Sequence, residues 1–221
     1  MTATFEPTER STVRRHSDRA SYDRDLVLSI LDEGLICHLA FVSDGSPVVI
    51  PTMYARLDDV IYLHGNPASR MLTTLGRGVD VSLAVTLLDG LVMARSVFSH
   101  SMNYRSVVIH GRAVEVTDKA EKMRAFQALV DHVCPGRWDE ARHPTAKELA
   151  TTRVVRLPLA EASAKVRTGP PKDSASDFRL PVWAGQLPLR LVPQQPIDDP
   201  TLAAGIAVPD YVAGYSREGG F

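Results

Sequence analysis

Two short segments of the sequence place an arginine beside a hydroxyl side chain. In the first, Ser69 and Arg70 follow a strand-like run and a Gly-Asn-Pro turn. In the second, Arg105 and Ser106 open an apolar run with the pattern of a strand. A guanidinium and a hydroxyl together suit a phosphate dianion, and the N–H groups at a helix start would assist in the first segment. Judged alone, each segment is explained at least as well by a solvated surface arginine.

Other common reactive patterns are missing from the sequence. It contains no GxxxxGK[ST], HExxH or GxSxG motif, which weakens nucleotide hydrolysis and lipase-type chemistry as functions. His132, Cys134 and His143 surround a Pro-Gly turn, but they lack a fourth ligand and a standard spacing, so no metal site is expected.

The elements that would position the arginines are mostly strands. Alternation of Val79, Val81, Leu83, Val85 and Leu87 predicts a strand with one buried face, and Asp44-Gly45 predicts a tight hairpin turn. Gly34 is expected to end the first helix in a left-handed conformation, and Gly111 to mark a bulge. Helices are predicted at Asp23–Glu33, Asp118–Val133 and Thr145–Ala150, and strands at Leu35–Ser43, Pro47–Arg56, Val60–His64, Val79–Leu87, Met102–Val116, Val154–Leu159 and Ser163–Arg167.

Size and composition indicate one globular domain with two appendages. The 221 residues are 44% hydrophobic with a formal net charge of -1, which gives no general attraction to nucleic acid or anionic membrane. A polar arm is expected at 1–22, the main domain at 23–168 and an extended tail at 169–221, because eight of the 15 prolines lie between 170 and 209. The tail is expected to pack on the main domain or on a partner subunit, since Trp183, Leu187 and Leu189 are too apolar for a solvated linker. Two distant cysteines and the lack of an apolar leader or spanning segment favour the cytoplasm.

Three segments together resemble a known family. They are Gly45 to Tyr54, Tyr62 to Met71 and Tyr104 to Ala113, the last followed by a matching stretch from Ala164 to Gly169. From about Arg24 to Ala184 the chain resembles the pyridoxamine-phosphate-oxidase-like FMN-binding split-barrel superfamily, and most of all its flavin-nucleotide-binding branch with nitroimidazole-resistance-type reductases. The resemblance implies a mainly β fold with peripheral helices, built on a six-stranded antiparallel split β-barrel.

The resemblance also implies a cofactor site. The backbone of Ile50 to Met53 would run beside the flavin ring, His64 would lie near the phosphate end, and Trp183 would cover the flavin or anchor the tail. The chain departs from true pyridoxamine phosphate oxidases at Ile50, where they have an arginine, and at Met71, where they have a lysine. The implied cofactor-binding residues are Ile50, Pro51, Thr52, Met53, His64, Ser69, Arg70, Tyr104, Arg105, Ser106 and Trp183.

By this resemblance, the leading hypothesis is an FMN-dependent oxidoreductase. It would carry out two-electron reduction or oxidation of a small organic molecule at a flavin in the interface of a homodimer, with a nicotinamide or deazaflavin donor, and without nucleic acid or membrane partners. The alternative is a flavin- or haem-binding sensor, carrier or regulator without turnover, in which His64, His100 or His110 would ligate a haem iron. A structural dimer with no cofactor remains a third interpretation.

Overall fold

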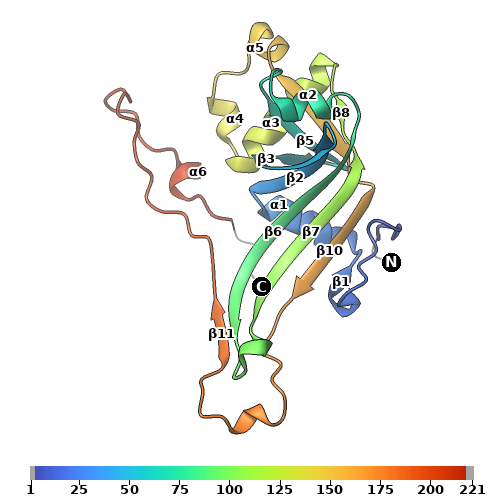
Figure 1. Cartoon of the computed structure of the whole chain (residues 1–221). Helices are drawn as coiled ribbons and strands as arrows, with labels where there is room; N and C mark the ends of the chain where they lie inside the picture. Colours follow the sequence, from blue (N-terminus) through green and yellow to red (C-terminus); the bar gives the residue numbers. More distant parts are fainter. Residues whose placement is uncertain (1–2, 218–221) are drawn as a thin grey trace.

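Two antiparallel sheets form the framework of the chain (Figure 1). The structure is a computed structural model and describes residues 3–217. The seven-stranded sheet consists of β1 (Ala20–Ser21), β10 (Glu161–Arg167), β7 (Ser101–Arg112), β6 (Asp80–Met93), β2 (Ile36–Ser43) and β3 (Ser46–Met53) in that order, with β11 (Gly185–Pro188) also paired to β6. The four-stranded sheet consists of β4 (Ala55–Leu57), β5 (Val60–Gly65), β9 (Arg153–Pro158) and β8 (Val114–Glu115).

The two sheets enclose one hydrophobic core. Leu39 and Leu83 from the larger sheet and Leu63 and Leu157 from the smaller one belong to the same buried cluster. The chain passes between the sheets after β3, after β5, after β7 and after β9. This arrangement is a split β-barrel, so the predicted mainly β class is confirmed, although short extra strands raise the strand count above six.

The longer helices lie against the outside of this core, whereas short helical segments occur in the tail and in connecting loops. They are α1 (Arg24–Glu33), α2 (Arg70–Leu75), α3 (Lys119–Val133), α4 (Arg137–Glu140), α5 (Ala146–Ala150) and α6 (Asp210–Ala213), with single 3-10 turns η1 (Ser17–Arg19), η2 (Val97–Ser99) and η3 (Asp177–Arg179). The predicted helices are confirmed, because Asp23, Asp118 and Thr145 cap α1, α3 and α5 through their side chains. The Asp44-Gly45 turn is also confirmed, with φ of 52° and 76°.

Two predictions about glycines were wrong. Gly34 has a φ of -68° and does not end α1 in a left-handed conformation. It is needed for close packing, since a Cβ there would lie 2.5 Å from Val85 Cγ1 and 2.9 Å from the Tyr54 hydroxyl. The register shift of the β6–β7 pair falls between Leu88 and Gly90 rather than at Gly111, and β6 continues to Met93 instead of ending at Leu87.

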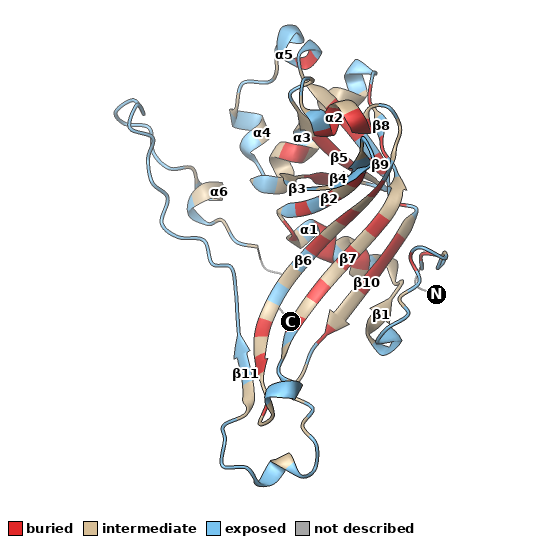
Figure 2. Ribbon diagram, viewed as in Figure 1, coloured by how far each residue is buried: buried red, intermediate tan, exposed pale blue. Residues whose placement is uncertain are grey.

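The two appendages differ in how they meet the body. The N-terminal arm packs against it, because Phe5 is buried in the main core and β1 pairs with β10. The tail after β10 forms a loop, pairs with β6 through β11, and then runs far from the body before α6 (Figures 1 and 2). Residues 189–208 of this tail are almost entirely exposed.

Candidate functional site

One face of the seven-stranded sheet packs on the core and α1, and its other face is largely open. We call this second surface the open face. Strand pairing aligns His38 of β2 with Ala84 of β6 and Val108 of β7, and one row further Ala40 with Ser82 and His110. Because side chains alternate along a strand, all of these lie on the open face. Its middle is therefore lined with small side chains, over which a flat ligand could lie.

Some of the predicted cofactor residues lie on the open face. Pro51 pairs with His38, so Pro51 and Met53 belong to this face, whereas Ile50 and Thr52 have the opposite parity. Ile50 accordingly packs against the core. Tyr104 and Ser106 belong to the open face at the other end of the sheet, since Ser106 pairs with Thr86 in the row next to Ala84.

The predicted phosphate pair of Ser69 and Arg70 lies at the start of α2. Arg70 is exposed, and within residues 3–217 its guanidinium has no ion-pair partner. Ser69 occupies the N-cap position, but its hydroxyl does not bond to the helix. Both side chains are therefore available to a ligand. The helix itself is anchored by Met71, Leu72 and Leu75 in the main core.

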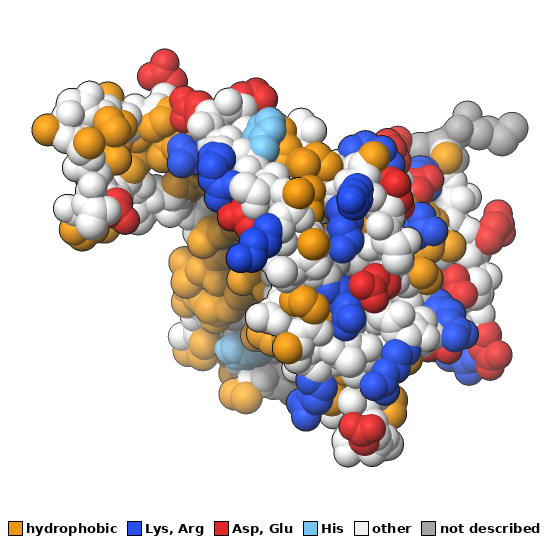
Figure 3. All heavy atoms as spheres, turned by 90° about the horizontal axis from the view of Figure 1, so that it is seen from above, with side chains coloured by type: hydrophobic (Ala, Val, Ile, Leu, Met, Phe, Trp, Pro, Cys, Tyr) orange, Lys and Arg blue, Asp and Glu red, His pale blue; other side chains and the backbone are white. Residues whose placement is uncertain are grey.

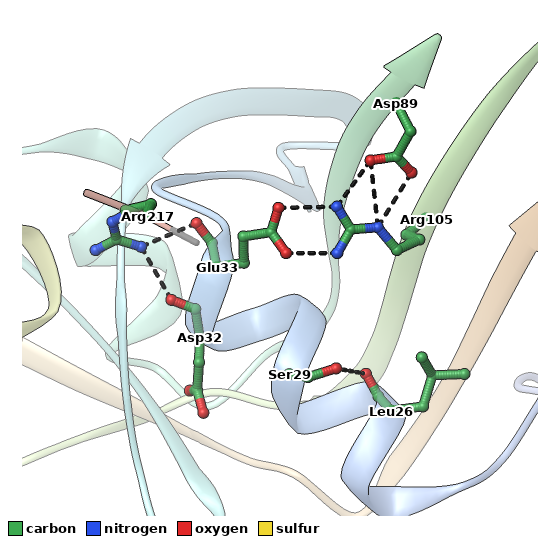
Figure 4. A network of polar contacts seen from close by, with 7 residues as sticks. All are labelled: Leu26, Ser29, Asp32, Glu33, Asp89, Arg105 and Arg217. Atoms are coloured by element: carbon green, nitrogen blue, oxygen red, sulfur yellow. Dashed lines mark hydrogen bonds and ion pairs between the residues drawn. The ribbon is translucent and has the colours of Figure 1, made fainter. Parts of the chain in front are cut away.

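Arg105 is committed to two carboxylates (Figure 4). Its guanidinium bonds to both carboxylate oxygens of Glu33 at the end of α1, with Nη2 2.8 Å from Oε1. Nη2 also lies 2.7 Å from Asp89 Oδ1, and Nε lies 3.1 Å from Oδ2. These bonds raise the pKa of the arginine, which is only 4% exposed. The three side chains together carry a net charge of -1, which repels a phosphate dianion rather than attracting it.

Arg70 and Arg105 therefore do not meet at one phosphate within the chain. Arg105 belongs to β7 beside the end of α1, and Arg70 opens α2 at the end of the molecule that carries α3 and β8 (Figure 1). Sequence reasoning missed Glu33 and Asp89, because they lie 72 and 16 residues from Arg105 and follow no motif with it.

A cavity of about 940 Å³ adjoins Arg105, on the side where the tail passes. Its walls come from β6, β7, the tail and the end of α1, where the Arg217 guanidinium donates to the Asp32 and Glu33 carbonyls at 2.9 Å each. Apolar side chains such as Leu88 and Leu191 line it together with polar ones such as Asn103 and Gln186. It adjoins the stretch of β6 whose edge opposite β7 is unpaired among the described strands, between the end of the β2 pairing at Ala84 and the start of the β11 pairing at Gly90.

Of the histidines considered as haem ligands, His64 differs from the other two. It lies on β5 under α3, with its ring edge against Phe126 at 5.7 Å between centroids. Burial lowers its pKa, and its buried Nδ1 has no hydrogen-bond partner among the described residues. His110 Nδ1 is bonded to Ser82 Oγ at 2.9 Å and His100 Nδ1 to the Ser96 carbonyl at 3.0 Å.

The remaining residues singled out in the sequence make contacts only with other parts of their own chain among the described residues. Trp183 is 66% exposed and its ring lies over Gly185, so it enters no notch of its own chain. His132 Nε2 bonds to the Gly34 carbonyl at 2.7 Å, and the His143 ring stacks on Trp138. None of the described helices is both long and apolar enough to cross a bilayer.

The fold and the open face define a member of the flavin-associated split barrels, and comparison with known proteins agrees. The family model described as pyridoxamine 5'-phosphate oxidase matches residues 23–166. The chain therefore belongs to the pyridoxamine 5'-phosphate oxidase family, as its sequence segments predicted. No curated protein matches the chain.

Two solved structures are similar over nearly the whole length. The flavocytochrome Anf3 from Azotobacter vinelandii is 39% identical, with a TM-score of 0.89 over 95% of this chain and 98% of that one. The FAD and heme binding protein from Mycobacterium smegmatis is 35% identical, with a TM-score of 0.85 over 89% of this chain and 96% of that one. A putative 5-nitroimidazole antibiotic resistance protein from Bacteroides thetaiotaomicron shares the fold at 22% identity and a TM-score of 0.57, over 66% of this chain and 86% of that one.

Proposed function

We propose that this protein binds a flavin against the open face and uses it for two-electron redox chemistry on a small organic molecule. The observation that carries the proposal is the row of small side chains, Ala40, Ser82 and Ala84, flanked by Pro51 and His38. A planar ring can approach a sheet closely only where the side chains are short. The similarity to a flavocytochrome and to a FAD and heme binding protein supports the same cofactor class.

The residues of the chain would position such a ring rather than react themselves. A bound flavin supplies hydride and electron transfer, so the protein's part is to orient the ring and to limit its contact with water. Pro51 has no N–H to offer, whereas the Thr86 hydroxyl faces the same side and is able to bond to ring heteroatoms. The Ser106 hydroxyl donates to the Lys165 carbonyl at 3.2 Å, so it would act toward the ring only as an acceptor. Both cysteines are free thiols, which supports a cytoplasmic location.

We favour FAD over the FMN that the sequence segments suggested. A terminal phosphate dianion is held best by several converging cations, and Arg105 is neutralised by Glu33 and Asp89. FAD has no terminal phosphate, and its adenosine half adds contacts that would compensate for the missing cation. The M. smegmatis relative, named for FAD, agrees with this choice.

The first test is the colour and flavin content of the purified protein. We expect paired near-ultraviolet and blue absorption bands, FAD released on denaturation, and bleaching on anaerobic mixing with a nicotinamide or deazaflavin donor. Arg70→Ala should raise the flavin Kd about tenfold, since one charge-assisted bond to a phosphate contributes roughly 1.5 kcal/mol. Arg77→Ala, an exposed arginine just after α2, is the matched control and should bind normally.

A colourless protein that fails to bind added flavin would refute the proposal. Flavin that stays oxidised with every donor would instead indicate a binding protein without turnover, and bound FMN would remove the preference for FAD.

We also propose a haem as a second cofactor, with His64 as the residue that would bind its iron. Both long relatives are named for haem as well as flavin. A neutral imidazole is the form that ligates iron, and burial keeps His64 in that form at neutral pH. The other two candidate histidines each use one ring nitrogen in a hydrogen bond, His110 with the Ser82 hydroxyl and His100 with the Ser96 carbonyl.

The haem proposal predicts a sharp Soret band beside the flavin bands. His64→Ala should abolish that band or shift it, while the flavin absorption remains, because the flavin lies on a different sheet. His100→Ala serves as the control, because His100 is exposed and occupies the C-cap position of η2. A Soret band that is unchanged in His64→Ala would assign the iron ligand elsewhere.

A further inference from the structure

Arg167, the last residue of β10, is a buried arginine without a carboxylate partner. The residue is only 6% exposed, yet no Asp or Glu among residues 3–217 lies within ion-pair distance of its guanidinium. Nη1 donates to Asn103 Oδ1 and, at 3.3 Å, to the Gly169 carbonyl, and Nη2 donates to the Pro170 carbonyl at 3.4 Å. All of these acceptors are neutral, so the positive charge of Arg167 is not compensated within the described chain.

The other buried arginine of the described chain is compensated. Arg105 is 4% exposed and bonds to two carboxylates, those of Glu33 and Asp89. On the face of the molecule shown in Figure 3, Lys and Arg side chains are likewise interspersed with Asp and Glu. Because a buried charge is costly unless an opposite charge accompanies it, Arg167 indicates an anion that the described chain does not itself supply.

Two more cations lie beside Arg167. Lys165 is two residues away on β10, and Arg19 precedes β1, whose Ala20 pairs with Lys165. Neither cation has an ion-pair partner among the described residues. Lys165 Nζ donates to the Arg15 carbonyl at 2.9 Å, which leaves two of its three N–H groups without a described partner. Burial and, after it, repulsion from Arg19 lower the pKa of Arg167, so the two guanidinium groups are close enough to interact.

The strand register places this cluster of three cations at the margin of the open face. Lys165 pairs with Ser106, one row along the sheet from the row that contains Ala84. Tyr104, one of the predicted cofactor residues, is the direct cross-strand neighbour of Arg167. Neighbouring strands are about 4.8 Å apart, so β10 lies about 10 Å from the small side chains of β6. A ribose and an attached ring are long enough to bridge this distance.

The number of cations indicates the kind of anion. Two guanidinium groups and an ammonium group match a phosphate or diphosphate, which carries several oxygens and at least two negative charges, better than a single carboxylate. The flavin proposed above already has Arg70 for a phosphate. Arg70 opens α2, and β10 runs away from α2, so that Arg167 lies at the far end of the strand (Figure 1). The two sets of cations therefore lie on different parts of the chain, and the second set fits a second ligand.

We propose that Arg167, Lys165 and Arg19 bind the phosphate groups of a second ligand, which in the proposed function is the phosphorylated electron donor. The donor would place its phosphates over the end of β10 and its reactive ring over the flavin. The assignment to a donor rests on the proposed function. The anion site itself rests on the uncompensated charge of Arg167, and it is testable without any flavin.

The first measurement is the binding of inorganic pyrophosphate to the full chain, with and without flavin, by isothermal titration calorimetry. We expect one site per chain and a Kd raised about tenfold by Arg167→Gln, since the variant removes charge-assisted bonds. Lys165→Gln, at a half-buried position, should also weaken binding, and it decides the matter if circular dichroism shows Arg167→Gln to be unfolded. Arg112→Gln, at an exposed arginine near the other end of β7, is the matched control and should bind as the wild type does.

The second measurement separates the donor from the flavin. Arg167→Gln should raise the KM for whichever donor bleaches the flavin, NADPH or a deazaflavin, about tenfold, while kcat and the Kd of FAD stay within about twofold of the wild type. A wild type that does not bind pyrophosphate overturns the proposal, and so does equal binding by the folded Arg167 and Lys165 variants. A raised Kd for FAD would place the flavin's own phosphates at the cluster and would also overturn it. Pyrophosphate binding by a protein that never takes up flavin would refute the proposed function and leave the anion site intact.

Discussion

Arg105 shows how far a single residue can be interpreted from sequence. Its position at the start of an apolar strand left two interpretations, a solvated surface residue or a phosphate ligand, whereas the structure buries it. Its partners, Glu33 and Asp89, come from a helix end and a neighbouring strand, and only the fold brings them together. Long-range ion pairs leave no local pattern, so the sequence alone assigned this arginine to a phosphate.

The Arg105 cluster leads to a stability prediction. Arg105→Met removes the cation and leaves two carboxylates close together in a partly buried site, which should lower the free energy of unfolding by about 2–4 kcal/mol. Urea denaturation followed by circular dichroism measures the change. Arg112→Met, at an exposed arginine on the same strand, should stay within about 0.5 kcal/mol of the wild type. Equal losses in both variants would mean that the ion pairs contribute no net stability.

At the scale of elements, β6 is the strand on which the site depends. It pairs with β7 along its length, with β2 near its start and with β11 near its end. Its alternating pattern was clear in the sequence as far as Leu87. The second part of β6, from Leu88 to Met93, does not alternate in this way. Its register with β7 shifts between Leu88 and Gly90, and its last residues pair with β11 of the tail. Such pairing depends on residues about a hundred positions away.

At Gly90 the backbone of the tail strand lies close against β6. A Cβ at this position would lie 2.9 Å from the Leu187 carbonyl oxygen and 3.3 Å from Pro188 Cα, and neither is a flexible side-chain end. Gly90→Ala should therefore detach β11, which limited proteolysis would detect as faster cleavage in the tail. Gly65→Ala is the control, because its Cβ would meet only the end of one side chain, Leu72 Cδ1 at 3.0 Å, and no backbone atom. Unchanged cleavage in Gly90→Ala would show that β11 docks without this contact.

At the scale of the molecule, composition and alternation predicted the β-rich class, the capped helices and the extended tail. They did not predict the course of the tail, because the attachments at Tyr211 and Arg217 depend on surfaces that form only after folding. The same holds for the open face, which needs the register of four strands. Local sequence patterns predict which residues are buried, whereas the candidate site is formed by contacts between residues that are distant in the sequence.

The four passages of the chain between the sheets, at Tyr54, through α2, at Ala113 and at Leu159, make each sheet depend on the other. Every strand of the smaller sheet is tied through one of these crossings to the larger one, so neither can be excised or transplanted as a self-sufficient module. Residues that hold ligands on either side consequently form and melt in one cooperative step.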